Sequence, residues 1–444
     1  MPLMELIILV VFVLGYISIT LEHTFKVDKL IPAITMMAIL WAIVSIAHMP
    51  VFEINPELKQ LEESYVKGVL VHHLGKTAEI LIFLIGAMTI VEIIDYFNGF
   101  YTFKKLIKTK SRARLLWIFG VLAFFLSAII DNLTATIVLV TILQKIVRDK
   151  KLRLWMAGMV VIAANAGGAW SPIGDVTTTM LWISDKVTVM GLIINVGIPS
   201  IVCMIIPFLI ASILPVFHGR IRDNEKDEFQ THAKGTAILI IGLSAIVFVP
   251  FFKIITHLPP YIGMMLSLAI VATCGEIYSR RHISLTKPSS DHNAHETPSP
   301  LHHSLTKIEF PSILFFLGIL MAVAALESLG MLYTFAKDLK VAIPNSDAVV
   351  GLLGILSAII DNVPLVAAGI GMFDYPMDHQ FWHLMAYAAG TGGSILIIGS
   401  AAGVVAMGME KINFFWYLSQ IGWIALIGFL SGFFAFIFMR DVVF

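Results

Sequence analysis

Two aspartates stand in the middle of long apolar segments, each within the same six residues. Residues 127 to 138 read SAIIDNLTATIV, and residues 357 to 368 read SAIIDNVPLVAA. An aspartate at the centre of a membrane costs roughly 2.5 to 3.5 kcal/mol on insertion scales, so it usually marks an ion path or a proton relay. Carboxylate, amide and hydroxyl oxygens suit hard cations and protons rather than soft metals. The repeated motif therefore predicts a cation and proton site.

The predicted ligands come from these two motifs and from two later glycine-containing segments, NAGGAWSPIGD and GTGGSILIIGS. Cation and proton binding is predicted at Asp131, Asn132, Thr134, Asp361, Asn362, Asp175, Ser127, Ser357, Thr391 and Ser394, with Na⁺ or Li⁺ held by Asp131, Asn132, Asp361 and Asn362. Glu327 is a candidate proton relay, and so is Asp95, for which an interfacial position is the alternative. Backbone breaks are predicted at Gly167, Gly168, Gly392 and Gly393.

The composition is that of a membrane protein. Of 444 residues, 58% are hydrophobic and 14% are charged, whereas soluble domains carry about 25% charged residues. The formal net charge is zero, which gives no support to nucleic-acid binding. The two cysteines, Cys203 and Cys274, lie in apolar segments without metal-ligand spacing, so both are interpreted as packing residues. No cofactor is predicted.

Apolar runs predict an all-α polytopic protein with ten full spans. They cover residues 3–21, 29–48, 77–95, 154–184, 188–217, 235–252, 260–277, 310–330, 382–408 and 413–439. The two motif segments, 115–146 and 349–373, are predicted to be re-entrant hairpins that enter and leave on one side. For 115–146 the alternative is one tilted span, but 32 residues is long for that.

Loop charge tests this arrangement, because Lys and Arg collect in cytoplasmic loops. With both termini outside, the predicted cytoplasmic segments hold 22 of the 30 basic residues. Arg112 and Arg114 precede the first hairpin, while Lys145 and Arg148 follow it, so both of its ends belong on the cytoplasmic side. The N-terminus and C-terminus are therefore predicted to be periplasmic.

The two motifs belong to an internal duplication. FLIGAM at 83–88 answers FFLGIL at 315–320, YTF recurs at 101–103 and 333–335, and the glycine segments follow in the same order. The first repeat is predicted as residues 1–217, a cytoplasmic linker as 218–234 and the second repeat as 235–444. Five spans per repeat invert the second copy, the architecture from which many secondary transporters build alternating access. The alternative is that the glycines merely permit close helix packing.

Competition for one carboxylate offers a coupling mechanism. A desolvated carboxylate binds a proton until an arriving cation displaces it, so exchange follows if only the neutralised site can switch faces. The halves differ: Asp175 has Ser400 at the matched position, and Thr134 is matched by Pro364. The first half is therefore expected to bind the cation first.

The SAIIDN pair, NAGGAWSPIGDVTT and GTGGSILIIGSAAG resemble the NhaD-type sodium/proton antiporters of the ion transporter superfamily, over nearly the whole chain. The resemblance implies an antiporter of the bacterial inner membrane that exchanges Na⁺ or Li⁺ for H⁺, is usually dimeric, and has a fold like that of the divalent-anion/sodium symporters. Those symporters carry Ser-Asn-Thr at the hairpin tips. Asp-Asn in this chain adds negative charge, which counts against a dicarboxylate substrate.

Other interpretations stay open. Another superfamily substrate, such as arsenite or a dicarboxylate, is the first; an intramembrane aspartic protease is remote, because its Tyr-Asp and Gly-Leu-Gly-Asp contexts are missing around Asp131 and Asp361. The polar loop 280–307 contains five histidines and is interpreted as a linker, with a cytoplasmic pH sensor as the alternative. Residues 51–76 are expected to form an external amphipathic helix.

Overall fold

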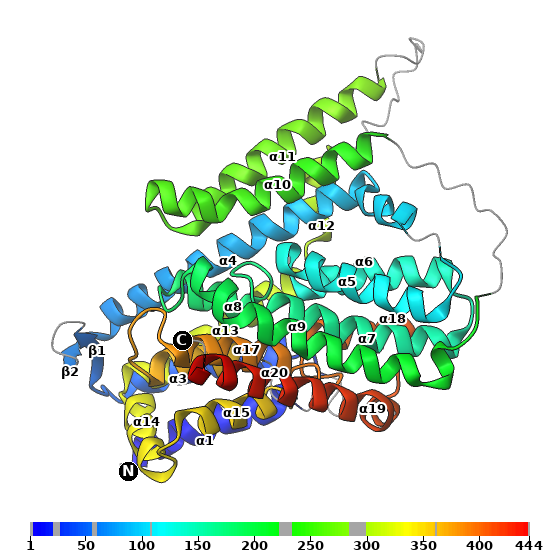
Figure 1. The fold of residues 1–444 in the computed structure, drawn as a ribbon. Helices are drawn as coiled ribbons and strands as arrows, with labels where there is room; N and C mark the ends of the chain where they lie inside the picture. The colour runs from blue at the N-terminus through cyan, green and yellow to red at the C-terminus, as the bar shows by residue number, and fades with distance from the viewer. Residues whose placement is uncertain are drawn as a thin grey trace.

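A computed structural model describes residues 3–20, 27–55, 60–106, 109–221, 233–283, 299–359 and 362–442. These residues are almost entirely helical (Figure 1). The first half contains α1 (Leu3–Thr20), α3 (Leu30–Ile46), β1 (Val51–Asn55), β2 (Gln60–Ser64), α4 (Val66–Tyr96), η1 (Gly99–Leu106), α5 (Arg112–Ile130), α6 (Asn132–Ile146), α7 (Lys150–Gly168), α8 (Val176–Ile183), α9 (Val189–Ile213) and η2 (Pro215–Phe217).

The second half is helical throughout its described parts. It contains α10 (Ala233–Thr256), α11 (Pro260–Ile283), α12 (Pro300–Lys307), α13 (Phe310–Ser328), α14 (Met331–Ala342), α15 (Ser346–Leu356), α16 (Asn362–Met372), α17 (Gln380–Gly392), α18 (Ala401–Glu410), α19 (Phe414–Tyr417), η3 (Leu418–Gly422) and α20 (Trp423–Val442). The predicted hairpins correspond to α5 with α6 and to α15 with α16, and the predicted broken helices to α7 with α8 and to α17 with α18.

Seven helices in the described part of the chain are long and apolar enough to cross a membrane unaided. The apolar helices α1 and α3 are shorter, and each broken helix consists of two pieces. The first hairpin arm, α5, has 19 residues, which corresponds to about 28 Å of helix. The turn at Asp131 therefore lies a full helix length away from the start of this arm.

The segment before α4 corrects one expectation. Residues 51–76 do not form one amphipathic helix, because β1 and β2 pair antiparallel and α4 begins only at Val66. The strand-forming residues are Val51, Phe52, Ile54 and Leu61, interleaved with charged ones. Alternation with a period of two is the pattern of a strand, and the scattered residues Glu53, Glu57, Glu62 and Glu63 concealed it.

Hairpins and broken helices pack together in a crossed pattern. Each hairpin rests on the first piece of the broken helix in its own half, α5 on α7 and α15 on α17. The returning arm then meets the second piece from the other half, so α6 packs on α18 and α16 on α8. The long helices pair across the halves in the same way, α3 with α13 and α4 with α11. The two halves of the chain therefore contact each other at the two helix breaks.

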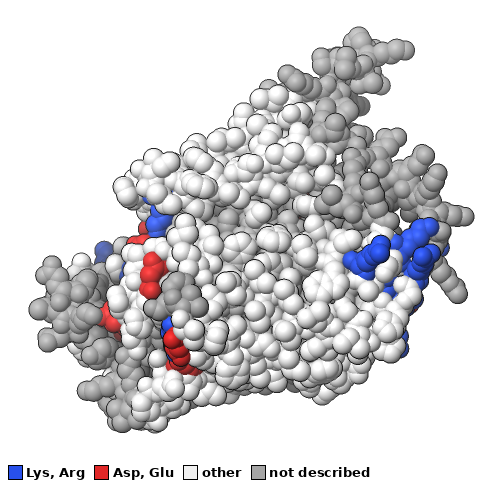
Figure 2. All heavy atoms as spheres, in the orientation of Figure 1, with Lys and Arg blue, Asp and Glu red and all other residues white. Residues whose placement is uncertain are grey.

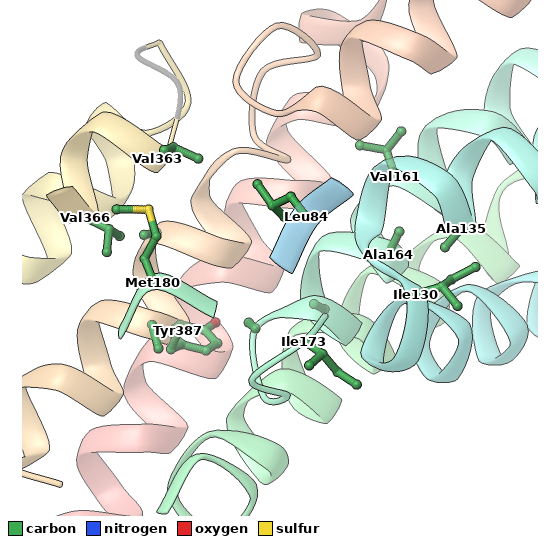
Figure 3. Close-up of a cluster of buried hydrophobic side chains, with 14 of the residues drawn as sticks. Leu84, Ile130, Ala135, Val161, Ala164, Ile173, Met180, Val363, Val366 and Tyr387 are labelled. Carbon is green, nitrogen blue, oxygen red and sulfur yellow. The ribbon is translucent and has the colours of Figure 1, made fainter. Parts of the chain in front are cut away.

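Apolar side chains from all of these elements surround the breaks (Figure 3). The labelled residues are buried and come from both hairpins, both broken helices and α4: Leu84, Ile130, Ala135, Val161, Ala164, Ile173, Met180, Val363, Val366 and Tyr387. In hydrocarbon an unwound backbone is tolerated only where protein covers it or where it lines a cavity. This cluster supplies that cover.

Glycines permit the closest approaches between hairpin and broken helix. A Cβ atom on Gly167 would lie 2.1 Å from the Phe124 carbonyl oxygen, and one on Gly392 would lie 2.0 Å from the Gly354 carbonyl oxygen. A backbone atom cannot move aside to make room for a Cβ, whereas the end of a flexible side chain can. The two contacts occupy matched positions in the duplication, so the predicted glycine breaks are also packing contacts.

Gly167→Ala should destabilise the protein by about 1 to 3 kcal/mol, the usual cost of overpacking a closed contact. The midpoint of thermal unfolding in detergent should fall accordingly. Gly408→Ala in α18 is the matched control, because a Cβ there has no neighbour within 4 Å and alanine favours helix. Equal midpoints for the two variants would contradict the contact.

Candidate functional site

Asp131 joins the two arms of the first hairpin and caps the second arm. Its backbone has φ 83°, a region that non-glycine residues occupy rarely and mostly at functional sites. The Thr134 N–H donates to Oδ1 at 2.8 Å, and the Thr134 hydroxyl donates to Oδ2 at 2.8 Å. Both carboxylate oxygens thus face the positive end of α6, where a negative charge is stabilised.

Asn132 starts a chain of buried amides that crosses between the halves. Its Nδ2 donates to Asn165 Oδ1 at 3.2 Å, and Asn165 Nδ2 donates to Ser400 Oγ at 3.1 Å and to the Val161 carbonyl at 2.9 Å. Asn165 has no exposed surface. The first hairpin is therefore linked through α7 to the break between α17 and α18.

Asp175 forms the reciprocal link. It ends the first break, is 3% exposed, and stands at the N-terminus of α8. Its Oδ2 accepts from Asn362 Nδ2 at 2.9 Å and from the Thr177 hydroxyl at 3.0 Å. Asn362 belongs to the second hairpin, so each hairpin contributes an asparagine to a crossed polar contact. The predicted ligand Asp361 lies outside the described residues.

The predicted hydroxyl ligands are buried and donate to backbone carbonyls. Ser127 donates to Ala164 at 2.6 Å, Ser357 to Gly354 at 2.7 Å, Thr391 to Tyr387 at 2.6 Å and Ser394 to Thr391 at 2.7 Å. These bonds fasten the segments around the breaks. Each oxygen keeps lone pairs, so ion binding by these hydroxyls stays a prediction.

Two cavities lie beside Asp131. The smaller holds about 20 Å³ and is lined by both Asp131 and Asp175 with apolar side chains of α4, α10 and α11. The larger holds about 420 Å³ and reaches Thr134. Its acidic and basic lining residues are Glu92, Asp95, Lys307 and Glu309. Asp131 and Asp175 therefore share one space, and a wider one opens next to it.

The two candidate relay residues lie on α4 and α13, each beside the returning arm of a different hairpin. Asp95 lines the larger cavity beside α6. Glu327 approaches α16, since a Cβ on Gly371 would lie 3.1 Å from its Oε2. Neither contacts Asp131 in any described hydrogen bond. Among the described residues, no group of three or more His, Cys, Asp or Glu could hold a metal ion.

Sequence reasoning missed Asn165, Ser400 and Thr177 as site residues. Asn165 opens the NAGGAWSPIGD segment, and a single asparagine within an apolar helix is a signal that could have marked it. Ser400 was noted only because it occupies the position in the second half that Asp175 occupies in the first. The crossed contacts depend on helices that are distant in sequence, which spacing alone does not reveal.

Comparisons with known proteins place the chain in a family. Residues 4–392 match the family model described as citrate transporter. Sodium/proton antiporter 1 and sodium/proton antiporter 2 of Arabidopsis thaliana are 40% and 38% identical, over 98% and 95% of this chain and 72% and 96% of theirs. The Na⁺/H⁺ antiporter NhaD of Vibrio cholerae is 30% identical over 94% of this chain and 88% of its own length. This chain belongs to the NhaD-type antiporter family.

A solved structure shares the fold. The YdaH transporter of Alcanivorax borkumensis, described as having an unusual topology, aligns with a TM-score of 0.56 over 96% of this chain and 98% of its own. At 14% identity the likeness concerns the fold alone. It agrees with the predicted class, an all-α polytopic membrane protein.

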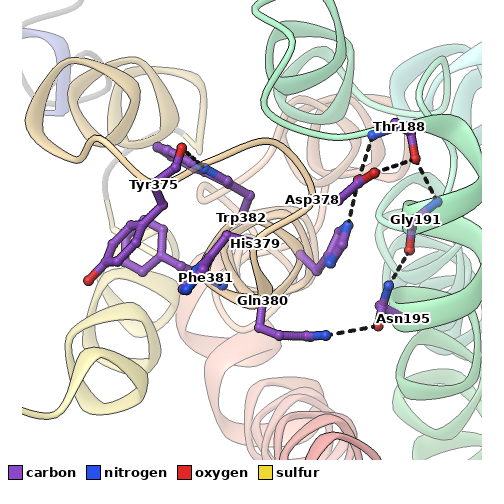
Figure 4. A network of polar contacts seen from close by, with 10 residues as sticks. Thr188, Gly191, Asn195, Tyr375, Asp378, His379, Gln380, Phe381 and Trp382 are labelled. Carbon is purple, nitrogen blue, oxygen red and sulfur yellow. Dashed lines mark hydrogen bonds and ion pairs between the residues drawn. The ribbon is translucent and has the colours of Figure 1, made fainter. Parts of the chain in front are cut away.

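A second polar network of this NhaD-type chain joins the starts of α9 and α17 (Figure 4). Asp378 accepts from the Thr188 N–H and the Thr188 hydroxyl, both at 2.7 Å, and lies 3.1 Å from His383 Nε2. The network continues from Thr188 through Gly191 and Asn195 to Gln380. Burial alone raises the pKa of Asp378, but the bonds from Thr188 and His383 outweigh it and hold that pKa below its usual 3.8.

Asp378→Asn should lower the thermal midpoint at neutral pH, because the charged form accepts these bonds best. A lowered folded pKa adds stability that is present above the unfolded pKa near 3.8 and is lost as the pH falls through the folded value. The gap between wild type and variant should therefore shrink below about pH 4. Asp338→Asn, at an exposed position, is the control. A gap that grows on acidification would contradict the sign.

Proposed function

We propose that this protein exchanges Na⁺ or Li⁺ for H⁺ across a membrane by alternating access, with cation and proton competing at Asp131 and Asp175. The observation that carries the proposal is that these two carboxylates line one small cavity, at the place where a hairpin turn meets a helix break. The related proteins named above are Na⁺/H⁺ antiporters by name. Their activity and the present geometry point to the same chemistry.

The donor set fits a small hard cation. Asp131 and Asp175 supply carboxylate oxygens, Asn132 and Asn165 supply amide oxygens, and all four are placed at helix ends or within helices. Oxygen donors of this kind suit Na⁺ and Li⁺ rather than soft metals. Because the site is lined mostly by apolar side chains, an unpaired charge there is costly, and either a proton or a cation removes that cost.

The two halves differ in a way that favours Asp131 for the cation. Thr134 gives Asp131 a backbone N–H and a hydroxyl. In the second half, the residue that corresponds to Thr134 is Pro364, which has no backbone N–H to donate. Asp131 therefore has support for its anionic form that Asp361 cannot receive from the same position. We infer that Asp131 binds the cation first and that Asp361 binds a proton more readily.

Alternating access would follow from the repeat. The crossed packing of hairpins on broken helices, and of α3 with α13 and α4 with α11, is what a twofold relation between halves would produce. The inversion of the second repeat stays a proposal. The large cavity beside Thr134 would be the open approach to the site, and the exchange cycle would close it.

The open approach would be cytoplasmic. Figure 2 shows Lys and Arg gathered at the end of the molecule where α5 begins and α6 ends, with acidic residues visible at the opposite end. Positive residues favour the cytoplasmic face, so the termini would lie outside, in the periplasm if the membrane is a bacterial inner membrane. The plant relatives leave the type of membrane open. A homodimer is part of the same proposal.

A carboxylate substrate is the second candidate because the family model is described as a citrate transporter. Asp131 and Asp175 argue against it, since a di- or tricarboxylate would meet two negative side chains in one cavity. Arsenite efflux has no specific support among these contacts. The remote alternative of an aspartic protease has no support from the sequence, because neither Asp131 nor Asp361 stands in a Tyr-Asp or Gly-Leu-Gly-Asp context.

Asp131→Asn should abolish Na⁺-induced proton release from the purified protein. The amide cannot release a proton when the cation arrives. Release would be read with a pH dye in weakly buffered detergent, and exchange would be read in everted vesicles as a sodium-dependent change of the pH gradient. We expect a loss of at least tenfold, since the group that is exchanged has been removed.

The control is Asp338→Asn, which removes a carboxylate from an exposed position. It should release protons and exchange cations like the wild type. Unchanged proton release from Asp131→Asn would overturn the assignment of Asp131. Citrate-dependent transport by the wild type without a sodium response would favour the second candidate.

A further inference from the structure

One lysine fastens the far end of α8. Lys253 on α10 donates from Nζ to the Trp182 carbonyl at 3.1 Å and to Asp185 Oδ1 at 2.9 Å, and its Nζ lies 5.1 Å from the centre of the Trp182 ring. Free carbonyls at a helix C-terminus attract a positive charge. A single side chain therefore joins the second piece of the first broken helix to α10, which lies in the other half of the chain.

The same face of α10 covers the ion site. Ile246 lines the small cavity that holds Asp131 and Asp175. Lys253 follows Ile246 by two helical turns, so the two side chains lie on one face of α10. Met264 of α11 lines the same cavity, and Figure 1 shows α10 and α11 side by side along one edge of the molecule. α10 and α11 therefore form part of the cover over Asp175, together with α4.

The two ends of the site are unequal. Toward Thr134 the protein holds a cavity of about 420 Å³, whereas the space between Asp131 and α10 is about 20 Å³. The site is thus accessible from the side of η1, α6 and α12 and covered on the side of α10. In an alternating-access cycle, the covered side is the one that has to open next.

We propose that Lys253 keeps the covered side of the site closed, because its bonds to Trp182 and Asp185 hold α10 to the end of α8. We call this contact the latch, and the covered side formed by α10 the outer gate. The inference rests on the alternating access proposed above. Opening of the gate breaks two hydrogen bonds and one cation–π contact at a single side chain. No bond within the ion site itself has to be lost first.

The strength of the contact suits a latch. The Asp185 side chain is 67% exposed and that of Lys253 is 23% exposed, and ion pairs at such positions are weak and readily broken. The far end of the other broken helix is held differently. Glu410, with a side chain 1% exposed, accepts from Arg153 Nε at 3.1 and 3.0 Å. Buried charge pairs are costly to separate, so this end is a fixed anchor.

The test measures access to α10 from each side of sealed vesicles. In a full-length background with Cys203→Ser and Cys274→Ser, an Ile246→Cys substitution would be labelled with a membrane-impermeant maleimide. Lys253→Met should raise the labelling rate from the outer side about two- to fivefold, the range set by one exposed ion pair. Thr141→Cys, in the large cavity, should be labelled from the opposite side, and more slowly when Lys253 is changed.

Three variants separate the latch from general damage. Asp185→Asn keeps the Trp182 bond and should raise outer labelling by a smaller factor, while Lys253→Arg should leave it near the parent value. Arg440→Met removes an ion pair with Asp347, at 2.8 Å, away from α8, and should change nothing. Parent-like outer labelling in both Lys253→Met and Asp185→Asn would overturn the latch, as would an equal rise in Arg440→Met.

Exchange activity is measured in the same preparations and keeps the two proposals apart. Labelling that shifts in a protein without Na⁺/H⁺ exchange would support the latch and contradict the proposed function. Exchange by the parent together with unmoved labelling would contradict the latch alone. Outer labelling that rises while Na⁺/H⁺ exchange persists at altered rate is the result expected if both hold.

Discussion

The structure depends on one constraint: backbone that leaves the helix inside a membrane must be covered by protein, because hydrocarbon offers its N–H and C=O groups no partner. Here a cluster of buried apolar side chains supplies the cover, and glycines let the hairpins approach the broken helices closely. Gly167 meets the Phe124 backbone, and Gly392 meets the Gly354 backbone in the matched place. Neither helix break would be stable in hydrocarbon without protein packed against it. Each becomes tolerable because a hairpin packs against it.

The polar site follows from this closure, because helix ends are brought together where helices are interrupted. Asp131, Asp175 and Ser400 each precede the first residue of a helix, at α6, α8 and α18. Helix N-termini carry partial positive charge and free N–H groups, so they favour carboxylates and hydroxyls. Negative charge is thereby supported in a small cavity whose described lining contains no lysine or arginine. A mobile cation or proton can supply the remaining compensation and can also leave.

Much of this could be predicted from the sequence because its signals are local. The hairpins were visible as long apolar runs that carry a repeated motif, the first with basic residues at both ends, and the breaks as glycine clusters. The β1–β2 pair was missed because its glutamates concealed a strand alternation. Asn165 was missed for another reason: its partners, Asn132 and Ser400, belong to an earlier hairpin and to the other half of the chain. Only packing decides which helix ends meet, and the crossed pairing of α6 with α18 and of α16 with α8 has no local signature.

The two halves carry the same residue type at positions where backbones approach closely, but different residue types at several buried polar positions. Gly167 and Gly392 match, as do the extended conformations of Asp175 and Ser400 at the starts of α8 and α18. By contrast, the residue that matches Asn165 is Gly390, and the residue that matches Asp175 is Ser400. A Cβ on Gly390 would lie 2.9 Å from Ala169 Cβ and 3.7 Å from Asp175 Oδ2. An asparagine in that position would therefore occupy the space next to the Asp175 carboxylate. Two identical halves would bring a second amide beside Asp175, next to the bond that Asn362 already makes, whereas glycine at position 390 leaves that space open.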